Sequence, residues 1–462
     1  MVRVFRHHIP VGTIVQWLAD AGIFLGSLLL AAYVQLAPYG ASASALLETG
    51  VVFALLMLAM NAAFGLYRRD EAITFAVIVG RLLLALALGA VLAYLLFYLM
   101  PGGQSAQAVL GYTLLYAACG QILLRQVMNT ARSAGIGARR VLIVGVGSEA
   151  KTVEESLKTI GYPRYAVVGF YQAGSDDASG MLSPGRVYAR QNNLTELVRR
   201  LRVQEVIVAV REQRGGVLPL RELLECRING VPVTDLAGFY ERVRGEVPIE
   251  SLKASWLIYG QGFAQDGLRT VVKRAFDIIA SAVLLILALP VMLLAAIAVY
   301  LESGLPIIYR QERVGRGGRT FMCLKFRSMR PDAEKDGVAR WATAGDSRIT
   351  RVGRVMRKTR IDELPQLINV LRGDMSLVGP RPERPCFVNE LKQQIRFYDI
   401  RHSVKPGLTG WAQVRYSYGA SVEDASKKLE YDLYYVKNHS LFLDVLILVE
   451  TVRVILFREG AH

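Results

Sequence analysis

Two adjacent carboxylates, Asp362 and Glu363, stand in a stretch of this 462-residue chain that is otherwise rich in cations. An acidic pair at the start of a helix can be no more than a favourable partner for the helix dipole. So many cations beside two carboxylates favour another role, a site for a multiply charged phosphate substrate. The carboxylates would then attack phosphorus or hold a divalent metal, and Mg²⁺ suits oxygens shared with phosphates. The basic residues concerned are Arg354, Arg357, Lys358, Arg360, Arg372 and Arg381.

Other basic motifs in the same part of the chain predict further contacts to phosphate. Lys325 and Arg327 follow an apparent strand at 320–324, Arg381 stands between two prolines, and Lys405 opens the run KPGLTGW. The planar guanidinium of arginine can hold two phosphate oxygens at once. Each motif alone could be a solvated turn, but together they indicate one anion-binding site in a final domain over 303–462.

The element before that domain is an apolar run at 278–301, with Pro290 in its middle and basic residues on both flanks. Its length would allow it to span a bilayer. Proline removes a helical hydrogen bond and bends the helix, and a spanning helix would carry the second basic cluster outside. We therefore predict a re-entrant membrane helix over 273–302, kinked at Pro290. A mainly helical α+β catalytic domain follows, in which 441–457 is an interfacial or core helix.

The first part of the chain, 1–130, predicts four transmembrane helices because each of its apolar segments can cross the hydrocarbon core. Lys and Arg lie before the first segment, between the second and third, and after the fourth, which puts both ends in the cytoplasm. Asp20 lies inside the first segment, where we expect a buried hydrogen bond between helices rather than a functional charge. The segments are 11–36, 46–67, 75–99 and 106–128.

Residues 139–240 alternate strand and helix patterns, which is typical of a Rossmann-like parallel sheet covered by helices. The first turn reads G-x-G-x-x-A from Gly145 through Gly147 and could cradle a pyrophosphate. The acidic ribose ligand expected after the second strand is missing, so a fold without a ligand is as well supported as a nucleotide site. Residues 241–272 are a connector. The expected strands are 141–145, 166–171, 205–210 and 231–235, and the helices lie near 148–160, 194–202 and 218–228.

Composition agrees with a membrane protein that handles anions. Hydrophobic residues make up 52% of the chain, and 55 Lys and Arg against 39 Asp and Glu give a formal charge of +16. Such a charge suits anionic lipid, phosphate compounds or nucleic acid. The chain has no basic helix with base-reading spacing and no RNA-binding aromatic motif, so we expect no nucleic acid. Its four scattered cysteines predict neither a disulfide framework nor a zinc site.

A set of motifs now points to a family. KRAFD, the proline-centred apolar run, YRQERVG, KFRSM, DELPQL, GDMSLVGPRP and KPGLTGWAQV follow one another between about 270 and 460. In this order they resemble the monotopic phosphoglycosyl transferases, the bacterial sugar transferases that start exopolysaccharide and O-antigen repeat units. The membrane helices and Rossmann-like domain before them resemble the long subgroup, the polyprenyl-phosphate hexose-1-phosphate transferases.

The resemblance implies a two-step reaction in the bacterial inner membrane, with the catalytic domain on the cytoplasmic face. Asp362 attacks the β-phosphorus of a UDP-sugar, releases UMP and carries the phosphosugar until undecaprenyl phosphate accepts it. Asp362 and Glu363 hold Mg²⁺, while Arg357 and Arg381 match positions that contact phosphate or substrate. Membrane lipid surrounds the re-entrant helix, and we expect a homodimer. The resemblance favours glucose or galactose as the donor sugar, with N-acetylhexosamines as the second choice.

Two departures from the family pattern affect single residues. Leu289 precedes Pro290 where many relatives have serine, so a serine hydrogen bond to the backbone is lost while the proline kink is kept. Arg415 is shifted from the arginine of the usual Asn-Gly-Arg run, which leaves its role as a substrate ligand and the choice of sugar open. The alternative function is a membrane-anchored nucleotide sensor that acts through 139–240 and catalyses nothing.

Overall fold

The chain divides into two compact units, one made of residues 1–2 and 8–244 and the other of 3–7 and 245–462. At its start β1 (Val2–Val4) and β2 (His7–Ile9) form a two-stranded sheet. The computed structural model describes residues 2–4, 7–9, 11–36, 43–67, 75–100, 103–133, 138–159, 165–173, 186–210, 218–249, 267–330, 346, 348–416, 419 and 421–457.

Long apolar helices open the first unit, as the sequence predicts. α1 (Val11–Leu36), α2 (Ala43–Ala63) and α3 (Phe75–Leu99) are each long and apolar enough to cross a membrane. Many of their large apolar side chains are exposed, which suits helices whose outer face meets lipid rather than water. Among the helices described, those that satisfy this criterion are these three and α11 (Gly267–Ser303).

The fourth predicted segment, 106–128, differs from expectation. It is interrupted at Val109, between α4 (Gln104–Ala108) and α5 (Leu110–Ser133), and α5 is not among the described helices apolar enough to span a membrane. The physical reason is the polar content of α5, in which Gln121 and Arg125 are buried within the unit. The predicted segment therefore starts in α4 and continues in α5, a helix of 24 residues.

A buried polar network joins α1, α2 and α5. The guanidinium of Arg125 donates two hydrogen bonds to Asp20, at 3.1 Å to Oδ1 and 2.7 Å to Oδ2, and a third to Gln121 Oε1 at 3.2 Å. Asn61 Nδ2 donates to Asp20 Oδ2 and to Gln121 Oε1, each at 3.4 Å. The expected interhelical hydrogen bond of Asp20 is confirmed, and it includes a buried ion pair.

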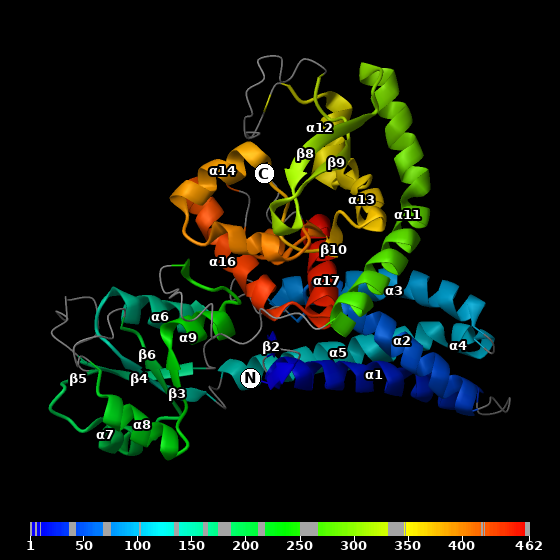
Figure 1. Cartoon of the computed structure of the whole chain (residues 1–462). Helices are drawn as coiled ribbons and strands as arrows, with labels where there is room; N and C mark the ends of the chain where they lie inside the picture. The colour runs from blue at the N-terminus through cyan, green and yellow to red at the C-terminus, as the bar shows by residue number, and fades with distance from the viewer. Residues whose placement is uncertain are drawn as a thin grey trace. The chain divides into compact units, whose positions relative to one another are not determined.

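The rest of the first unit is a three-layer α/β domain. Its five parallel strands lie in the order β5-β4-β3-β6-β7, with α6 and α9 packed on one face and α7 and α8 on the other (Figure 1). Alternate residues of β3 serve the two cores: Val141 and Ile143 face α6 and α9, and Leu142 and Val144 face α7 and α8. The elements are β3 (Arg139–Val144), α6 (Ser148–Thr159), β4 (Tyr165–Tyr171), β5 (Val187–Tyr188), α7 (Leu194–Arg200), β6 (Glu205–Val208), α8 (Leu220–Ile228), β7 (Val233–Asp235) and α9 (Leu236–Val243).

The second unit packs short helices and strands around one core, with α11 along its side (Figure 1). β8 and β9 form an antiparallel hairpin, and β10 pairs in parallel with β11. After α11 the elements are β8 (Ile308–Val314), η4 (Arg316–Gly318), β9 (Thr320–Phe326), α12 (Arg351–Thr359), η5 (Ile361–Glu363), α13 (Gln366–Arg372), β10 (Ser376–Val378), α14 (Pro385–Gln394), η6 (Tyr398–Ser403), β11 (Gly407–Thr409), α15 (Trp411–Arg415), α16 (Val422–Asn438) and α17 (Leu441–Phe457).

The predicted connector, 241–272, is partly built into this second unit. Trp411 Nε1 donates to the carbonyl of Gly245 at 2.7 Å, and the amide of Val247 donates to the carbonyl of Glu430 at 3.0 Å. The side chain of Val247 belongs to the core. Residues 250–266 lie outside the described part, and α11 begins at Gly267, earlier than the predicted 273.

Both ends of α11 are bound by the second unit. Near its start, Lys273 Nζ pairs with Asp444 at 2.7 Å, and Arg274 donates to the carbonyls at the end of α13. At its end, Glu302 accepts the amide of Arg351 at 2.7 Å, and Arg327 donates to the carbonyl of Ser303 at 2.6 Å. Pro290 lies inside this continuous, curved helix rather than between two helices (Figure 1).

We predict that the first unit depends on the Asp20–Arg125 pair. Asp20→Asn leaves the guanidinium of Arg125 buried without its counter-ion, and removing one partner of a buried pair costs about 3–5 kcal/mol. The thermal midpoint of the full-length protein in detergent, followed by loss of soluble protein on heating, should fall by several degrees. The double variant Asp20→Asn, Arg125→Gln removes both charges and should recover part of the loss. A midpoint unchanged by Asp20→Asn would contradict this role.

Candidate active site

The turn between α12 and α13 presents the carboxylate pair. α12 ends at Arg360, whose φ of 61° lies in the left-handed region, and η5 then carries Asp362 and Glu363. A residue other than glycine pays about 1–2 kcal/mol for this backbone geometry, which persists only where the surrounding contacts enforce it. Pro365 directly precedes α13 and ends the turn. The turn holds both carboxylates in the domain, each residue only 7% exposed.

Glu363 is held by cations from three elements. Its Oε1 lies 2.8 Å from Lys325 Nζ on β9, 2.8 Å from Arg381 Nη2, and 3.9 Å from Arg360 Nη1. Burial alone would raise the pKa of this carboxyl. The charges of Arg381, Lys325 and Arg360 oppose burial and hold the pKa well below its usual range. Glu363 is therefore an ionised anchor at neutral pH.

Asp362 has a different environment although it is the next residue. Its Oδ1 is buried and accepts no hydrogen bond from the residues that the structure describes. Burial, with the neighbouring charge of Glu363, raises the pKa of Asp362 above its ordinary value, while Lys325, Arg357 and Arg360 act in the opposite direction. The two neighbouring carboxyl groups therefore differ in their hydrogen bonding and in the direction of their pKa shifts.

The structure brings three of the five predicted phosphate-binding residues to the pair. Lys325 and Arg381 contact Glu363 directly, and the charge of Arg357 acts on Asp362. The other two have different partners: Arg327 donates to Ser303 and Gly304 at the end of α11, and Arg415 stacks 4.3 Å from the Trp411 ring. Their roles as phosphate ligands stay predictions.

Arg360 is the residue that sequence reasoning undervalues. The sequence places it among the cations near the pair but gives no reason to assign it a contact. Its spacing of three residues from Glu363 was the available signal, because residues at i and i+3 meet when the chain turns helically. In the structure its guanidinium approaches Glu363 within ion-pair distance, at 3.9 Å.

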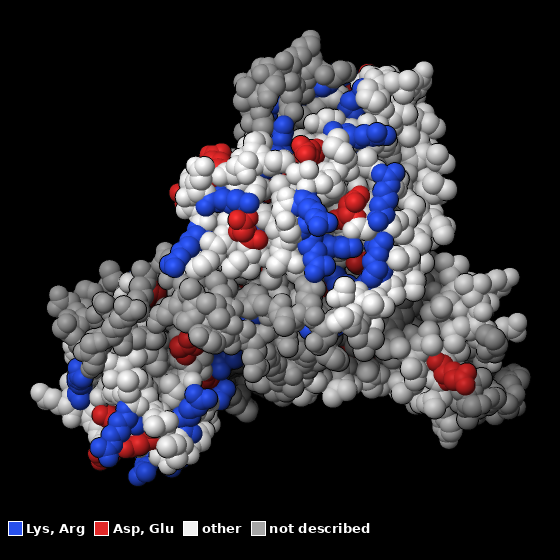
Figure 2. Space-filling view, viewed as in Figure 1, with Lys and Arg blue, Asp and Glu red and all other residues white. Residues whose placement is uncertain are grey.

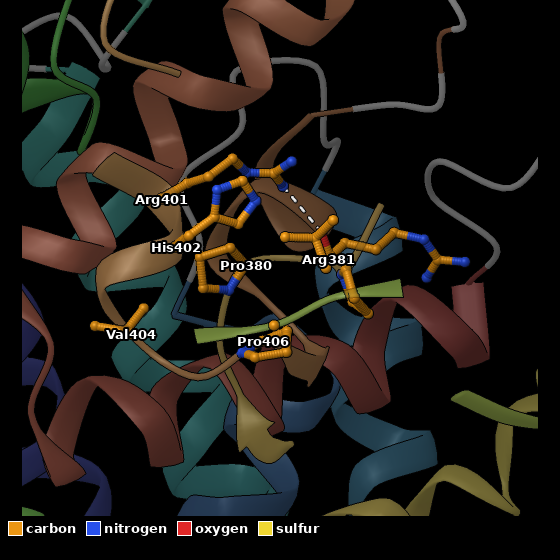
Figure 3. A pocket seen from close by; sticks show the side chains of 9 residues that line it. Pro380, Arg381, Arg401, His402, Val404 and Pro406 are labelled. Carbon is orange, nitrogen blue, oxygen red and sulfur yellow. Dashed lines mark hydrogen bonds between the residues drawn. The ribbon is translucent and has the colours of Figure 1, made fainter. Parts of the chain in front are cut away.

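A buried ion pair holds the main chain of Arg381 through a hydrogen bond to its carbonyl. Arg401 pairs with Asp432 at 2.8 Å and donates from the same nitrogen to the carbonyl of Arg381 at 3.0 Å (Figure 3). His402 stays neutral because burial and Arg401 lower its pKa to about 4. A small pocket lies on this side of Arg381, lined by Val314, Gly315, Pro380, Arg381, Pro382, Arg401, His402, Val404 and Pro406.

The donor set fits a magnesium ion shared with substrate. No group of three or more His, Cys, Asp or Glu side chains occurs among the described residues, so a cage made only of protein is not what this part of the chain offers. Mg²⁺ is commonly held by one or two carboxylates together with substrate phosphates and water. Asp362, with its unpaired Oδ1, and Glu363 would hold the ion in that way.

The structure explains why the predicted nucleotide-binding turn of the first unit begins with a glycine. Gly145 has a φ of 126°, and a Cβ there would lie 2.7 Å from the carbonyl oxygen of Ala209. Glycine is therefore required for the end of β3 to pack beside the chain that follows β6. The carbonyl of Gly147 accepts the amides of Ala150 and Lys151 at the start of α6. Neither contact tests nucleotide binding, which stays a prediction.

Comparison with known proteins assigns both units. The family model for bacterial sugar transferases matches residues 268–458, and one described as a CoA-binding domain matches residues 62–216. A UDP-glucose:undecaprenyl-phosphate glucose-1-phosphate transferase of Xanthomonas campestris pv. campestris is 33% identical over 351 residues, 74% of this chain and 71% of that protein. An undecaprenyl-phosphate galactose phosphotransferase of Salmonella typhimurium is 33% identical over 354 residues, 71% of this chain and 70% of that protein.

A third relative is more similar over a shorter stretch. A UDP-N-acetylgalactosamine-undecaprenyl-phosphate N-acetylgalactosaminephosphotransferase of Aeromonas hydrophila is 45% identical over 242 residues. These are 52% of this chain and 56% of that protein, so the match spans little more than half of the relative.

The chain belongs to the bacterial sugar transferase family, as the motifs of its last third predict. Within it, the chain falls in the long subgroup of hexose-1-phosphate transferases, since relatives of that description match across most of its length. The resemblance noted in the sequence is confirmed.

The unequal carboxylates predict opposite shifts in the pH profile of UMP release from a UDP-sugar. A reaction that uses Asp362 as nucleophile needs its ionised form, so activity would be lost as the pH falls through its raised pKa. Glu363→Gln removes a charge that raises this pKa and should move the acid limb to lower pH. Lys325→Met removes a charge that lowers it and should move the limb to higher pH. Rates at saturating Mg²⁺ from pH 4 to 8 would show this; shifts in one common direction would contradict the assignment.

Proposed function

We propose that this protein transfers a hexose-1-phosphate from a UDP-sugar to undecaprenyl phosphate through a covalent intermediate on Asp362. The observation that carries the proposal is the contrast within the carboxylate pair. Glu363 is neutralised by Lys325 and Arg381, whereas Asp362 keeps a buried oxygen without a hydrogen-bond donor among the described residues. An anchored carboxylate beside a free one suits nucleophilic catalysis, which divides one difficult transfer into two easier steps.

In the first step an oxygen of Asp362 attacks the β-phosphorus of the donor. A bond forms between the Asp362 oxygen and the β-phosphorus, and the bond from the β-phosphorus to the bridging oxygen breaks. UMP leaves and keeps the bridging oxygen. Lys325, Arg357 and Arg381 would bind the diphosphate and stabilise the charge that develops on it. The phosphosugar is then held as an acyl phosphate on Asp362.

In the second step a phosphate oxygen of undecaprenyl phosphate attacks the same phosphorus. The bond to Asp362 breaks, the carboxylate is restored, and the product is a polyprenyl diphosphate sugar. Mg²⁺, held by Asp362, Glu363 and phosphate oxygens, would neutralise charge on the transferring group. The proposal includes a magnesium requirement, which the donor set suits, and a homodimer.

The relatives include donors from both sugar classes that the resemblance implies. The named relatives act on UDP-glucose, galactose or UDP-N-acetylgalactosamine donors, and the 45% identical relative is the last of these. We therefore propose a UDP-hexose or UDP-N-acetylhexosamine donor. The model described as a CoA-binding domain matches residues 62–216, beside the sugar-transferase match over 268–458, and the proposal places catalysis in the latter.

We also propose that α11 is re-entrant and that the second unit lies on the cytoplasmic face of the inner membrane. A helix of 37 residues is about 55 Å long, well beyond the roughly 30 Å hydrocarbon core. Its first turns bind α13, β10 and α17, and its last turn binds β9 and α12. A helix with both ends on one polar domain cannot place those ends on opposite sides of a bilayer.

We predict that Asp362→Asn abolishes both UMP release and the phosphosugar adduct. The amide that replaces the carboxylate is far less nucleophilic, so no acyl phosphate forms. Intact-protein mass spectrometry after mixing with UDP-sugar, without acceptor, would detect the added mass in wild type alone. Asp374→Asn, on the same domain and beyond η5, serves as a control for loss of one carboxylate. A turning-over Asp362→Asn enzyme would refute the nucleophile.

We predict that both ends of α11 are reached from the cytoplasm. Single cysteines Val271→Cys and Arg310→Cys, in a chain whose four native cysteines are replaced, are labelled with a membrane-impermeant maleimide. Each should react in inverted vesicles and not in intact spheroplasts, because the polar domain holds both ends. Gln104→Cys, in the connection predicted to lie outside, should show the reverse pattern. Labelling of Arg310→Cys from outside would establish a spanning helix.

A further inference from the structure

Two basic residues that the proposed chemistry does not use meet at one point of the second unit, and a third, Arg316, acts on Lys405 electrostatically from a neighbouring hairpin. Arg274 comes from the first turns of α11, Lys405 precedes β11, and Arg316 lies at the tip of the β8–β9 hairpin. A Cβ on Gly373 would lie 3.4 Å from Arg274 Nη2 and 3.6 Å from Lys405 Nζ. The two cationic head groups therefore share the space above the backbone of Gly373.

The ammonium of Lys405 is not neutralised by the protein. Within the described part of the chain no carboxylate forms an ion pair with it, and the closest acidic groups are engaged elsewhere. Asp277 accepts hydrogen bonds from Ser376 and Leu377, and Asp374 accepts one from Asn369. Burial, Arg274 and Arg316 together lower the pKa of Lys405 against the weaker pull of Asp277 and Asp374. A bound anion would relieve this repulsion.

The cluster is also built on a fixed frame. The guanidinium of Arg274 donates to the carbonyls of Val370 at 2.6 Å and Leu371 at 2.8 Å, which fixes one wall of the cluster. Gly373 follows α13 with a φ of 99° and has no side chain to fill the space between the cations. η4, which carries Arg316, lies against η6, so the hairpin tip is held near Lys405.

Apolar surface adjoins the cluster on α11. Val271 and Ile278 stand three residues before and four residues after Arg274, on the same helix face, and are 65% and 41% exposed. Figure 2 shows further Lys and Arg side chains on the surface of the second unit. A soluble anion would need the cations alone, whereas an amphiphile with a phosphate head and an apolar chain would use both the cations and the helix face.

We propose that Arg274, Arg316 and Lys405 form a binding site for the phosphate head of a membrane lipid, with its chain along α11. The cations that act most strongly on Asp362 and Glu363 are different residues, so this is a second anion site. Two kinds of membrane lipid carry such a head group: polyprenyl phosphate and a bulk anionic phospholipid. Only binding of polyprenyl phosphate rests on the proposed function.

The test measures lipid binding by the full-length protein in nanodiscs of phosphatidylcholine. Wild type is titrated with a short-chain polyprenyl phosphate, with phosphatidylglycerol and with inorganic phosphate. Lys405→Gln and Arg316→Gln should each weaken lipid binding about fivefold, since a basic residue near an anionic membrane surface contributes a factor of that size. The double variant should bind more weakly than either single variant. Lys405→Arg keeps the charge and should bind as wild type does.

Arg319→Gln is the matched control, because it removes the same charge from the same hairpin at a residue that is not among the largest influences on the pKa of Lys405. Weakened binding of polyprenyl phosphate alone identifies the acceptor, and weakened binding of phosphatidylglycerol as well identifies a general lipid site; both support the inference. Equal losses in Arg319→Gln, or a folded double variant that binds both lipids as wild type does, would overturn it. UMP release by wild type tests the proposed function separately.

Discussion

The ionisation of one buried carboxylate organises the candidate active site. Glu363 is buried, and an isolated charge there would be prohibitively costly. Lys325 from β9, Arg381 from the segment after β10, and Arg360 from the end of α12 remove that cost together. Three elements distant in sequence are thereby brought to one point, and the left-handed turn at Arg360 is held in place. The position of Asp362 follows, because it shares the turn with the anchored residue.

The same unit fixes the membrane helix through polar contacts at both of its ends. Asp277 receives Ser376 Oγ and the amide of Leu377 in the buried interior, while Glu302 caps the first turn of α12 and Arg327 binds the last carbonyls of α11. These groups would be poorly satisfied in lipid, so their pairing keeps the ends of α11 with the domain. The site at Asp362 is consequently tied to a helix that exposes many large apolar side chains.

The sequence predicts elements best where a physical pattern is long. α1 and α3 begin and end at the predicted residues because uninterrupted apolar runs define them, whereas β5 and α9 are missed because two and eight residues carry little periodicity. The motifs also locate the carboxylates, but they do not predict which partner each basic side chain contacts. Lys325 and Arg327 are two residues apart, yet one reaches Glu363 and the other the end of α11. Only the tertiary arrangement decides between those partners.

Arg381 is held through both its side chain and its main chain. Its guanidinium neutralises Glu363, while its carbonyl accepts from Arg401, which is itself paired with buried Asp432. Gly379 and Pro380 next to it are bound to the β11 segment through the carbonyl of Thr409 and the amide of Gly407. A phosphate that draws the Arg381 side chain away from Glu363 therefore need not move the backbone.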